Sequence, residues 1–105
     1  GYNDLICDMR SLETLKKNGF PVILDATHSI QKPGGQGSKS GGQREFIEPL
    51  ARAGTSLGLA GLFIETHEKP ERAPSDGESM LQLKNLEPLL EKVIAIDRTV
   101  KSFDQ

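Results

Sequence analysis

The feature that most constrains the fold is a short apolar run closed by an acidic residue, which occurs three times along the chain. The runs cover residues 5–8, 22–25 and 62–65. Each run is continuously apolar rather than alternating, which is typical of strands buried on both faces. A helix-compatible stretch follows each run, so we expect the order βαβαβα and a parallel α/β sheet with right-handed crossovers.

Three stretches carry the periodicity of helices. The first begins at Ser11 and places Leu12 and Leu15 on one face. The second runs from about residue 43 to 57. The third, residues 86–103, keeps a helical period over almost five turns and is the clearest of the three.

Composition excludes several classes of partner. The 105 residues include 15 acidic and 13 basic side chains, a formal net charge of −2, which gives no electrostatic reason to expect nucleic acid or a membrane surface. No apolar run approaches the roughly 20 residues of a membrane helix. The single cysteine, Cys7, cannot form an intrachain disulfide. Without a signal-peptide pattern, we expect a cytoplasmic protein.

Acidic residues recur at the ends of the expected strands. In parallel α/β folds, ligands collect at the carboxyl edge of the sheet. Asp8, Asp25 and Glu65 should all lie at that edge. A single carboxylate there often only caps the following turn, but three in register favour a binding site.

Two expected loops are unusually long. Residues 27–42 hold five glycines, and residues 67–85 hold two prolines and a glycine. Loops of this length are usually functional lids or disordered. The first loop is not a Walker loop, because Ser38 precedes Lys39, and it is not a dinucleotide fingerprint, because Ser40 stands where the last glycine belongs. It retains the amides, lysine and hydroxyls that can close over a phosphate ester.

One histidine and two carboxylates suggest a metal site. His28 follows the second strand by three residues, Glu65 ends the third strand, and Asp76 lies in the last loop. An imidazole with two carboxylates suits a divalent cation that keeps positions open for substrate or water. For His67, two residues after Glu65, we expect a structural hydrogen bond.

Several motifs together carry a family resemblance. They are Asp25-Ala26-Thr27-His28-Ser29, Pro33-Gly34-Gly35, Lys39-Ser40-Gly41-Gly42, Arg44-Glu45-Phe46, Gly61-Leu62-Phe63-Ile64-Glu65-Thr66-His67 and Ser75-Asp76-Gly77. In combination they resemble the 3-deoxy-D-manno-octulosonate 8-phosphate synthase family over essentially the whole chain. That family folds as a (β/α)8 TIM barrel of roughly 250 residues or more. The resemblance implies that residues 1–105 are the C-terminal part of one barrel domain, strands six to eight, with the N-terminal strands absent from this chain.

The resemblance also implies an activity. The family condenses phosphoenolpyruvate with D-arabinose 5-phosphate and water to give 3-deoxy-D-manno-octulosonate 8-phosphate and phosphate, in lipopolysaccharide biosynthesis. We therefore expect an aldol-type synthase, a transferase that acts as a homotetramer through the full-length protein. These 105 residues alone should be inactive.

The family's site residues carry over onto this chain by motif. Metal-dependent members bind a divalent ion (Mn, Fe, Zn or similar) through a cysteine of the first strand and three further ligands. Those three match His28, Glu65 and Asp76, and His28 and Asp76 are also the candidates for catalysis. Gln31 and Ser40 match positions that face the sugar phosphate, and Asp25 is the third candidate for substrate binding.

The family has a metal-independent branch, which remains an alternative. Its members carry asparagine in place of the first-strand cysteine and tend to carry cysteine just before the loop aspartate. Ser75 stands at that second position here, which favours metal dependence.

Two other functions stay open. The related 3-deoxy-arabino-heptulosonate 7-phosphate synthase uses erythrose 4-phosphate, but its loop typically reads Pro-Ser-His where this chain has Ala26-Thr27-His28. A flavodoxin-like binding module without catalytic activity would need a phosphate loop after its first strand. This chain has only Met9-Arg10 there, with no glycine.

Overall fold

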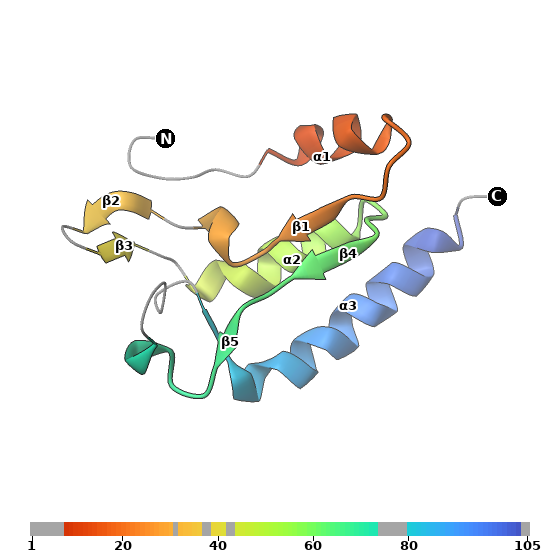
Figure 1. Cartoon of the computed structure of the whole chain (residues 1–105). Coiled ribbons are helices and arrows are strands. Elements are labelled where there is room, and N and C mark those ends of the chain that lie inside the picture. Colours follow the sequence, from red (N-terminus) through yellow and green to blue (C-terminus); the bar gives the residue numbers. More distant parts are fainter. Residues whose placement is uncertain (1–7, 31, 37–38, 42–43, 74–79, 104–105) are drawn as a thin grey trace.

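The computed structural model describes residues 8–30, 32–36, 39–41, 44–73 and 80–103. Figure 1 shows a strand pair with helices beside it and a small hairpin at one end. The elements, in chain order, are α1 (Met9–Lys16), β1 (Ile23–Asp25), β2 (Lys32–Gln36), β3 (Lys39–Gly41), α2 (Ile47–Thr55), β4 (Gly61–Phe63), β5 (Thr66–His67), β6 (Leu81–Gln82) and α3 (Leu86–Lys101). Short 3-10 turns occupy His28–Ile30, Arg44–Phe46, Pro70–Arg72 and Leu83–Asn85.

Strands β1 and β4 form the parallel pair that the sequence predicts. Ile23 lies opposite Gly61, and Asp25 lies opposite Phe63. The Ala26 amide extends the pairing by donating to the Phe63 carbonyl at 2.9 Å. The second and third apolar runs are therefore adjacent parallel strands, as expected. Residues 5–7 of the first run lie outside the described residues.

Part of each expected loop is ordered as strand, and there the sequence-based prediction was wrong. Strands β2 and β3 pair in antiparallel fashion within the glycine-rich segment. Strand β5 begins at Thr66, just before the second expected loop, and pairs in parallel with β6 inside that loop. The Leu81 amide also donates to the Glu65 carbonyl at 2.9 Å. Pairs this short bury too few side chains to leave a pattern in the sequence, so tertiary context decides them.

Three helices form where the periodicity indicates, but two of them have other bounds than expected. Helix α1 begins at Met9, before the expected Ser11, and α2 is shorter than the expected residues 43–57, whereas α3 begins at residue 86 as expected. Asp8 caps α1, because its Oδ1 accepts from the Arg10 amide at 2.9 Å. Hydrogen bonds from the Arg10 side chain and backbone hold the pKa of Asp8 below its usual value. Helices α2 and α3 lie side by side, joined by an ion pair of 2.9 Å between Glu48 Oε2 and Lys92 Nζ. No helix in the described part of the chain is long and apolar enough to cross a membrane.

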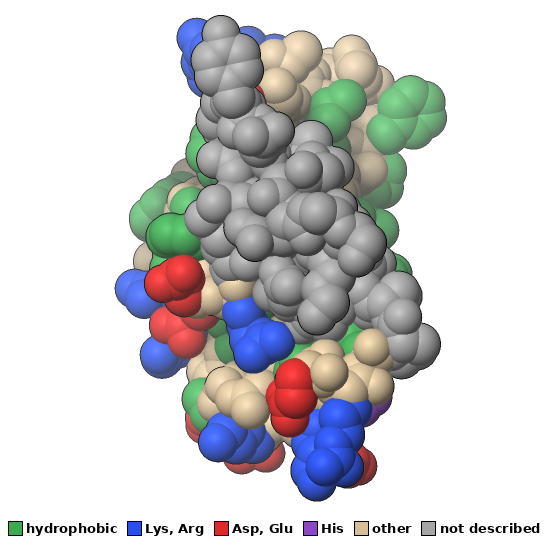
Figure 2. Space-filling model, turned by 90° about the vertical axis from the view of Figure 1, so that its left-hand side faces the viewer, with side chains coloured by type: hydrophobic (Ala, Val, Ile, Leu, Met, Phe, Trp, Pro, Cys, Tyr) green, Lys and Arg blue, Asp and Glu red, His purple; other side chains and the backbone are tan. Residues whose placement is uncertain are grey.

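The core lies between the helices and one face of the strand pair. Its two clusters are Ala26, Ile47, Ala51, Leu81 and Leu89, and Leu12, Val22, Leu24 and Leu59. The other face is open: Ile23 is 66% exposed and Phe63 is 50% exposed. Among the described residues, the expected burial on both faces is therefore seen only on the helix side. Figure 2 shows acidic and basic side chains close together on one end of the molecule, in keeping with the small net charge.

Candidate functional site

The strand-end acids divide into two groups. Asp8 acts as a helix cap, which is the structural role that the sequence left open for a single carboxylate. Asp25 and Glu65 lie together at the carboxyl edge of the β1–β4 pair, as the register of the two strands requires. This edge is therefore the candidate site.

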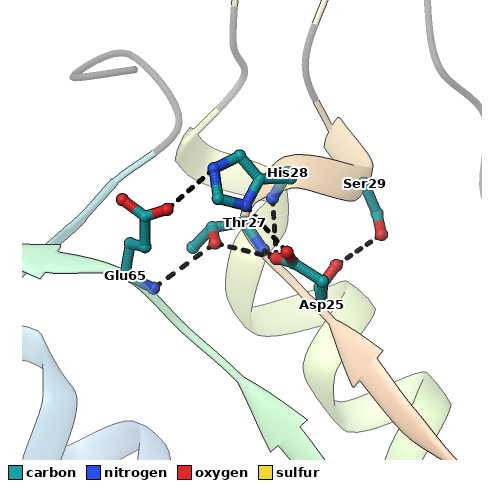
Figure 3. Close-up of polar contacts among 5 residues, drawn as sticks. All are labelled: Asp25, Thr27, His28, Ser29 and Glu65. Carbon is teal, nitrogen blue, oxygen red and sulfur yellow. Dashed lines mark hydrogen bonds and ion pairs between the residues drawn. The ribbon is translucent and has the colours of Figure 1, made fainter. Parts of the chain in front are cut away.

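His28 lies between these two carboxylates. Its Nδ1 atom is 2.7 Å from Asp25 Oδ2, and its Nε2 atom is 2.7 Å from Glu65 Oε1. Figure 3 shows the imidazole ring spanning the ends of the two strands. All three side chains are half-buried, so each keeps part of its surface exposed. Two residues singled out by the sequence, His28 and Glu65, are thus brought into direct contact.

Asp25 shapes the turn that presents His28. Its Oδ1 atom accepts from the Thr27 amide at 3.1 Å, the Thr27 hydroxyl at 3.0 Å and the His28 amide at 2.9 Å. Ser29 closes the turn by donating its hydroxyl to the Asp25 carbonyl. An aspartate that binds amides two and three residues ahead fixes a turn without help from a sheet. The sequence Asp-Ala-Thr-His-Ser therefore determines the local geometry of this histidine.

The electrostatics of Asp25 follow from the same bonds. Partial burial raises the pKa of Asp25, but the hydrogen bonds from His28 and Thr27 outweigh it and hold the pKa below its usual value. Asp25 is therefore ionised at neutral pH and is an acceptor for every group that surrounds it.

The donor set fits a divalent cation. A ligating histidine usually donates its second ring N–H to a carboxylate, which orients the ring, and Asp25 is placed to accept from Nδ1. His28 Nε2 and a Glu65 oxygen are a nitrogen and an oxygen donor of the kinds that zinc, manganese and iron accept. Two neighbouring ligands about 2.1 Å from one ion lie about 3.0–3.4 Å apart. The observed 2.7 Å needs to open by only a few tenths of an ångström.

The sequence names three further site candidates, Asp76, Gln31 and Ser40. Asp76 and Gln31 lie outside the described residues, and Ser40 lies on β3. Within the described ranges, no three His, Cys, Asp or Glu side chains are grouped so that they could hold a metal ion. His67 has the structural role expected of it, because its Nδ1 accepts from the Lys69 amide at 2.9 Å.

Thr27 is the residue of this site that sequence reasoning missed. Its side chain is 1% exposed, and its hydroxyl contacts both Asp25 and the Glu65 amide, the latter at 3.3 Å. The available signal was the spacing Asp-x-Thr directly after a strand, which is typical of a side-chain-capped turn.

Comparison with known proteins gives a consistent picture. The sequence model described as the DAHP synthetase I family matches residues 1–102. The 2-dehydro-3-deoxyphosphooctonate aldolase of Agrobacterium fabrum is 60% identical over 102 residues, which is 97% of this chain and 36% of that protein. The proteins of the same name from Rhizobium meliloti and Brucella ovis are 57% and 58% identical, over 97% and 98% of this chain and 36% and 37% of theirs. The chain therefore spans little more than a third of the length of these relatives.

Proposed function

Because the chain belongs to the DAHP synthetase I family, we propose that it forms part of a 2-dehydro-3-deoxyphosphooctonate aldolase. Such an enzyme condenses phosphoenolpyruvate with D-arabinose 5-phosphate and water, giving 3-deoxy-D-manno-octulosonate 8-phosphate and phosphate. The observation that carries the proposal is 57–60% identity to relatives of this name over 97% of the chain. We propose the cytoplasm as its location and a homotetramer as the form of the whole enzyme.

The heptulosonate reaction is the second candidate, because the family description covers that related synthase. The names of the relatives favour the octulosonate reaction. The Ala26-Thr27-His28 sequence supports the same choice, since the resemblance gives Pro-Ser-His to the heptulosonate enzymes.

We propose that the described strands belong to a (β/α)8 barrel, with residues 1–105 supplying strands six to eight of one barrel domain. Two observations support this. The β1–β4 pair is parallel with helices on one face, as in a barrel wall. The opposite face exposes Ile23 and Phe63, which are apolar residues of the kind that fill a barrel interior.

We propose that His28 and Glu65, together with Asp76, hold a divalent ion such as manganese, iron or zinc. When bound, such an ion polarises the aldehyde of the sugar phosphate as a Lewis acid. The contact between His28 Nε2 and Glu65 Oε1 supports this assignment. In a metal-independent enzyme, the same side chains would hold water and substrate by hydrogen bonds.

The residues of this chain then have distinct tasks in the reaction. Carbon 3 of phosphoenolpyruvate forms a bond to the aldehyde carbon, water adds to carbon 2, and the resulting intermediate loses phosphate. Since both substrates are phosphorylated anions, the site must hold them together and orient the water. We assign Gln31 and Ser40 to the sugar phosphate, and His28 and Asp76 to the reacting groups. The β2–β3 hairpin, which carries Ser40, follows directly after the His28 turn and lies beyond the carboxyl end of β1 (Figure 1).

A chimeric enzyme tests the proposal. In this protein, the chain replaces the matching residues of the Agrobacterium fabrum aldolase, to which it is 60% identical. We expect phosphate release from phosphoenolpyruvate with D-arabinose 5-phosphate and much slower release with erythrose 4-phosphate. Preference for erythrose 4-phosphate would support the heptulosonate alternative, and a folded chimera that is inactive with both sugars would contradict the proposal.

A further inference from the structure

Thr27 is a buried polar side chain to which neither the sequence motifs nor the proposed reaction gives a role. Among the described residues, only Thr27 and Thr55 are polar and buried. Thr55 donates its hydroxyl to the Ala51 carbonyl of its own helix at 2.7 Å, so it is satisfied locally. Thr27 instead bonds to residues at the ends of two different strands, Asp25 and Glu65. Because a buried hydroxyl needs its hydrogen-bond partners, these bonds tie the two strand ends together.

The direction of each bond is fixed by its partners. The Glu65 amide can only donate, so the Thr27 oxygen accepts from it. The Asp25 carboxylate can only accept, so the same hydroxyl donates its proton to Oδ1. One hydroxyl therefore connects the carboxylate at the end of β1 to the backbone of Glu65, which follows β4 (Figure 3).

This connection reaches both sides of the His28–Glu65 contact. Asp25 Oδ2 holds the Nδ1 side of the imidazole ring, while Oδ1 holds the turn and the Thr27 hydroxyl. Thr27 in turn holds the main chain from which the Glu65 side chain extends. Both oxygens of Asp25 are thus bonded to groups of the chain itself, although its position at the strand edge suggested contact with substrate.

We propose that Thr27 and Asp25 are positioning residues, which set His28 and Glu65 at the separation that a shared ligand needs. Asp25 acts through His28 rather than by binding substrate. The inference rests on the proposed function in one respect, because the shared ligand is taken to be the divalent ion. Partners that orient metal ligands typically contribute about 10- to 100-fold to metal affinity.

Two substitutions of Thr27 separate its hydroxyl from its shape. Thr27→Val keeps the volume and removes the hydrogen bonds, leaving the Glu65 amide without its acceptor. Thr27→Ser keeps the hydroxyl and removes the methyl group. In the chimera, with Mn²⁺ alone as the probe, we expect Thr27→Val and Asp25→Asn to weaken binding about 10- to 100-fold. Thr27→Ser should stay within about threefold of the parent, by the same reasoning.

Thr55 supplies the matched control. Thr55→Val also removes the hydroxyl of a buried threonine, but its bond lies within α2, away from the site. We expect Thr55→Val to leave Mn²⁺ affinity unchanged even where it lowers the unfolding temperature. Equal affinity in Thr27→Val and the parent, or equal losses in Thr27→Val and Thr27→Ser, would overturn the proposal.

The nitrogen NMR signals of the His28 ring provide a readout that does not depend on metal. In the metal-free chimera, Thr27→Val should shift and broaden these signals, while Thr27→Ser and Thr55→Val should not. If the parent chimera binds no Mn²⁺, the metal assignment fails, and the ring signals still test positioning. Ring signals that do not change in a folded Thr27→Val protein would contradict the positioning role of Thr27. If Thr27→Val does not fold, the His28 ring signals are compared between Asp25→Asn, where they should change, and Thr27→Ser, where they should not.

Discussion

The Nε2 atom of His28 lies 2.7 Å from Oε1 of Glu65, although the two residues belong to different βα units of the chain. The parallel register of β1 and β4 brings their carboxyl ends together, and the turn capped by Asp25 directs the imidazole toward its neighbour. This single contact joins the fold to the proposed chemistry, because it places a nitrogen and an oxygen donor at the edge where barrel enzymes bind their substrates.

If Glu65 is a metal ligand as proposed, Glu65→Gln should impair the reaction without unfolding the protein. In the chimera we expect Mn²⁺ affinity and kcat/KM to fall by at least about 100-fold, because loss of a ligand should cost no less than loss of its supporting partner. The half-exposed pair with His28 contributes only about 1 kcal/mol or less to stability. Glu68→Gln, at an exposed position nearby, is the control. A Glu65→Gln protein with parental turnover would remove Glu65 from the site.

Ser40→Ala should affect the two substrates unequally. If the β2–β3 hairpin contacts the sugar phosphate, the KM for D-arabinose 5-phosphate rises more than the KM for phosphoenolpyruvate. Steady-state kinetics of the chimera with each substrate varied in turn give both values, and Ser56→Ala, at an exposed position after α2, is the control. Equal effects on both substrates, or none, would show that the hairpin is only a connection.

Glu48→Gln should destabilise the protein in a pH-dependent way. The hydrogen bond from Lys92 holds the pKa of Glu48 below its usual value. A carboxyl group whose pKa is lower in the folded than in the unfolded protein stabilises the fold at pH values above its pKa in the unfolded protein. This contribution is lost as the pH falls through the pKa that the group has in the folded protein. The parent should therefore have the higher unfolding temperature at pH 7, with the difference shrinking below about pH 4. Glu91→Gln, at an exposed position on α3 next to Lys92, is the control. A difference that grows on acidification would contradict the assignment.

Gly54→Ala should destabilise the packing of α2 on β1. A β-carbon at Gly54 would lie 2.5 Å from Cδ2 of the buried Leu24. Alanine gains about 1 kcal/mol of helix propensity, but overpacking a core typically costs about 1–3 kcal/mol. We expect a net loss of about 1–2 kcal/mol in the free energy of unfolding, measured by denaturant titration of the chimera. Ala53→Gly, at the exposed neighbouring position, measures how much the difference in helix propensity between alanine and glycine contributes to stability. An unchanged or raised stability in Gly54→Ala would show that Leu24 moves freely.

The periodic and strand-end features could be read from the sequence. The parallel pairing of residues 22–25 with 62–65 follows from two continuous apolar runs separated by a helix, and α3 follows from its long apolar stripe. The convergence of His28 and Glu65 follows from the pairing, since both come directly after paired strands. These features depend on local sequence pattern and on the rule that two strands joined by a helix pair in parallel.

Other features depend on long-range contacts that leave no local pattern. The β5–β6 pair consists of two residues on each side, and β2–β3 lies in a segment rich in glycine. The role of Thr27 requires knowing that the Glu65 amide lies beside its hydroxyl, which only the folded chain shows. The open face at Ile23 and Phe63 was likewise not predictable from apolarity alone.

The exposed face of the β1–β4 pair leads to a prediction for residues 1–105 on their own. Residues 1–105, expressed alone, should aggregate or remain without fixed tertiary packing, because exposed apolar strand faces and unpaired edges favour association. Size-exclusion chromatography and thermal unfolding measure this, with the chimera as the folded reference. A monomeric chain that unfolds cooperatively would contradict the barrel proposal and would favour a self-contained binding module.

Phosphate release by the chimera, before and after removal of metal, tests the central claim most directly. The enzyme is treated exhaustively with chelator, and the rate with phosphoenolpyruvate and D-arabinose 5-phosphate is measured before and after Mn²⁺ is added back. We predict that chelation abolishes turnover and that Mn²⁺ restores it, because the proposal assigns the neighbouring His28 and Glu65 side chains as ligands of one ion. Turnover that survives complete removal of metal would contradict this account and place the protein in the metal-independent branch.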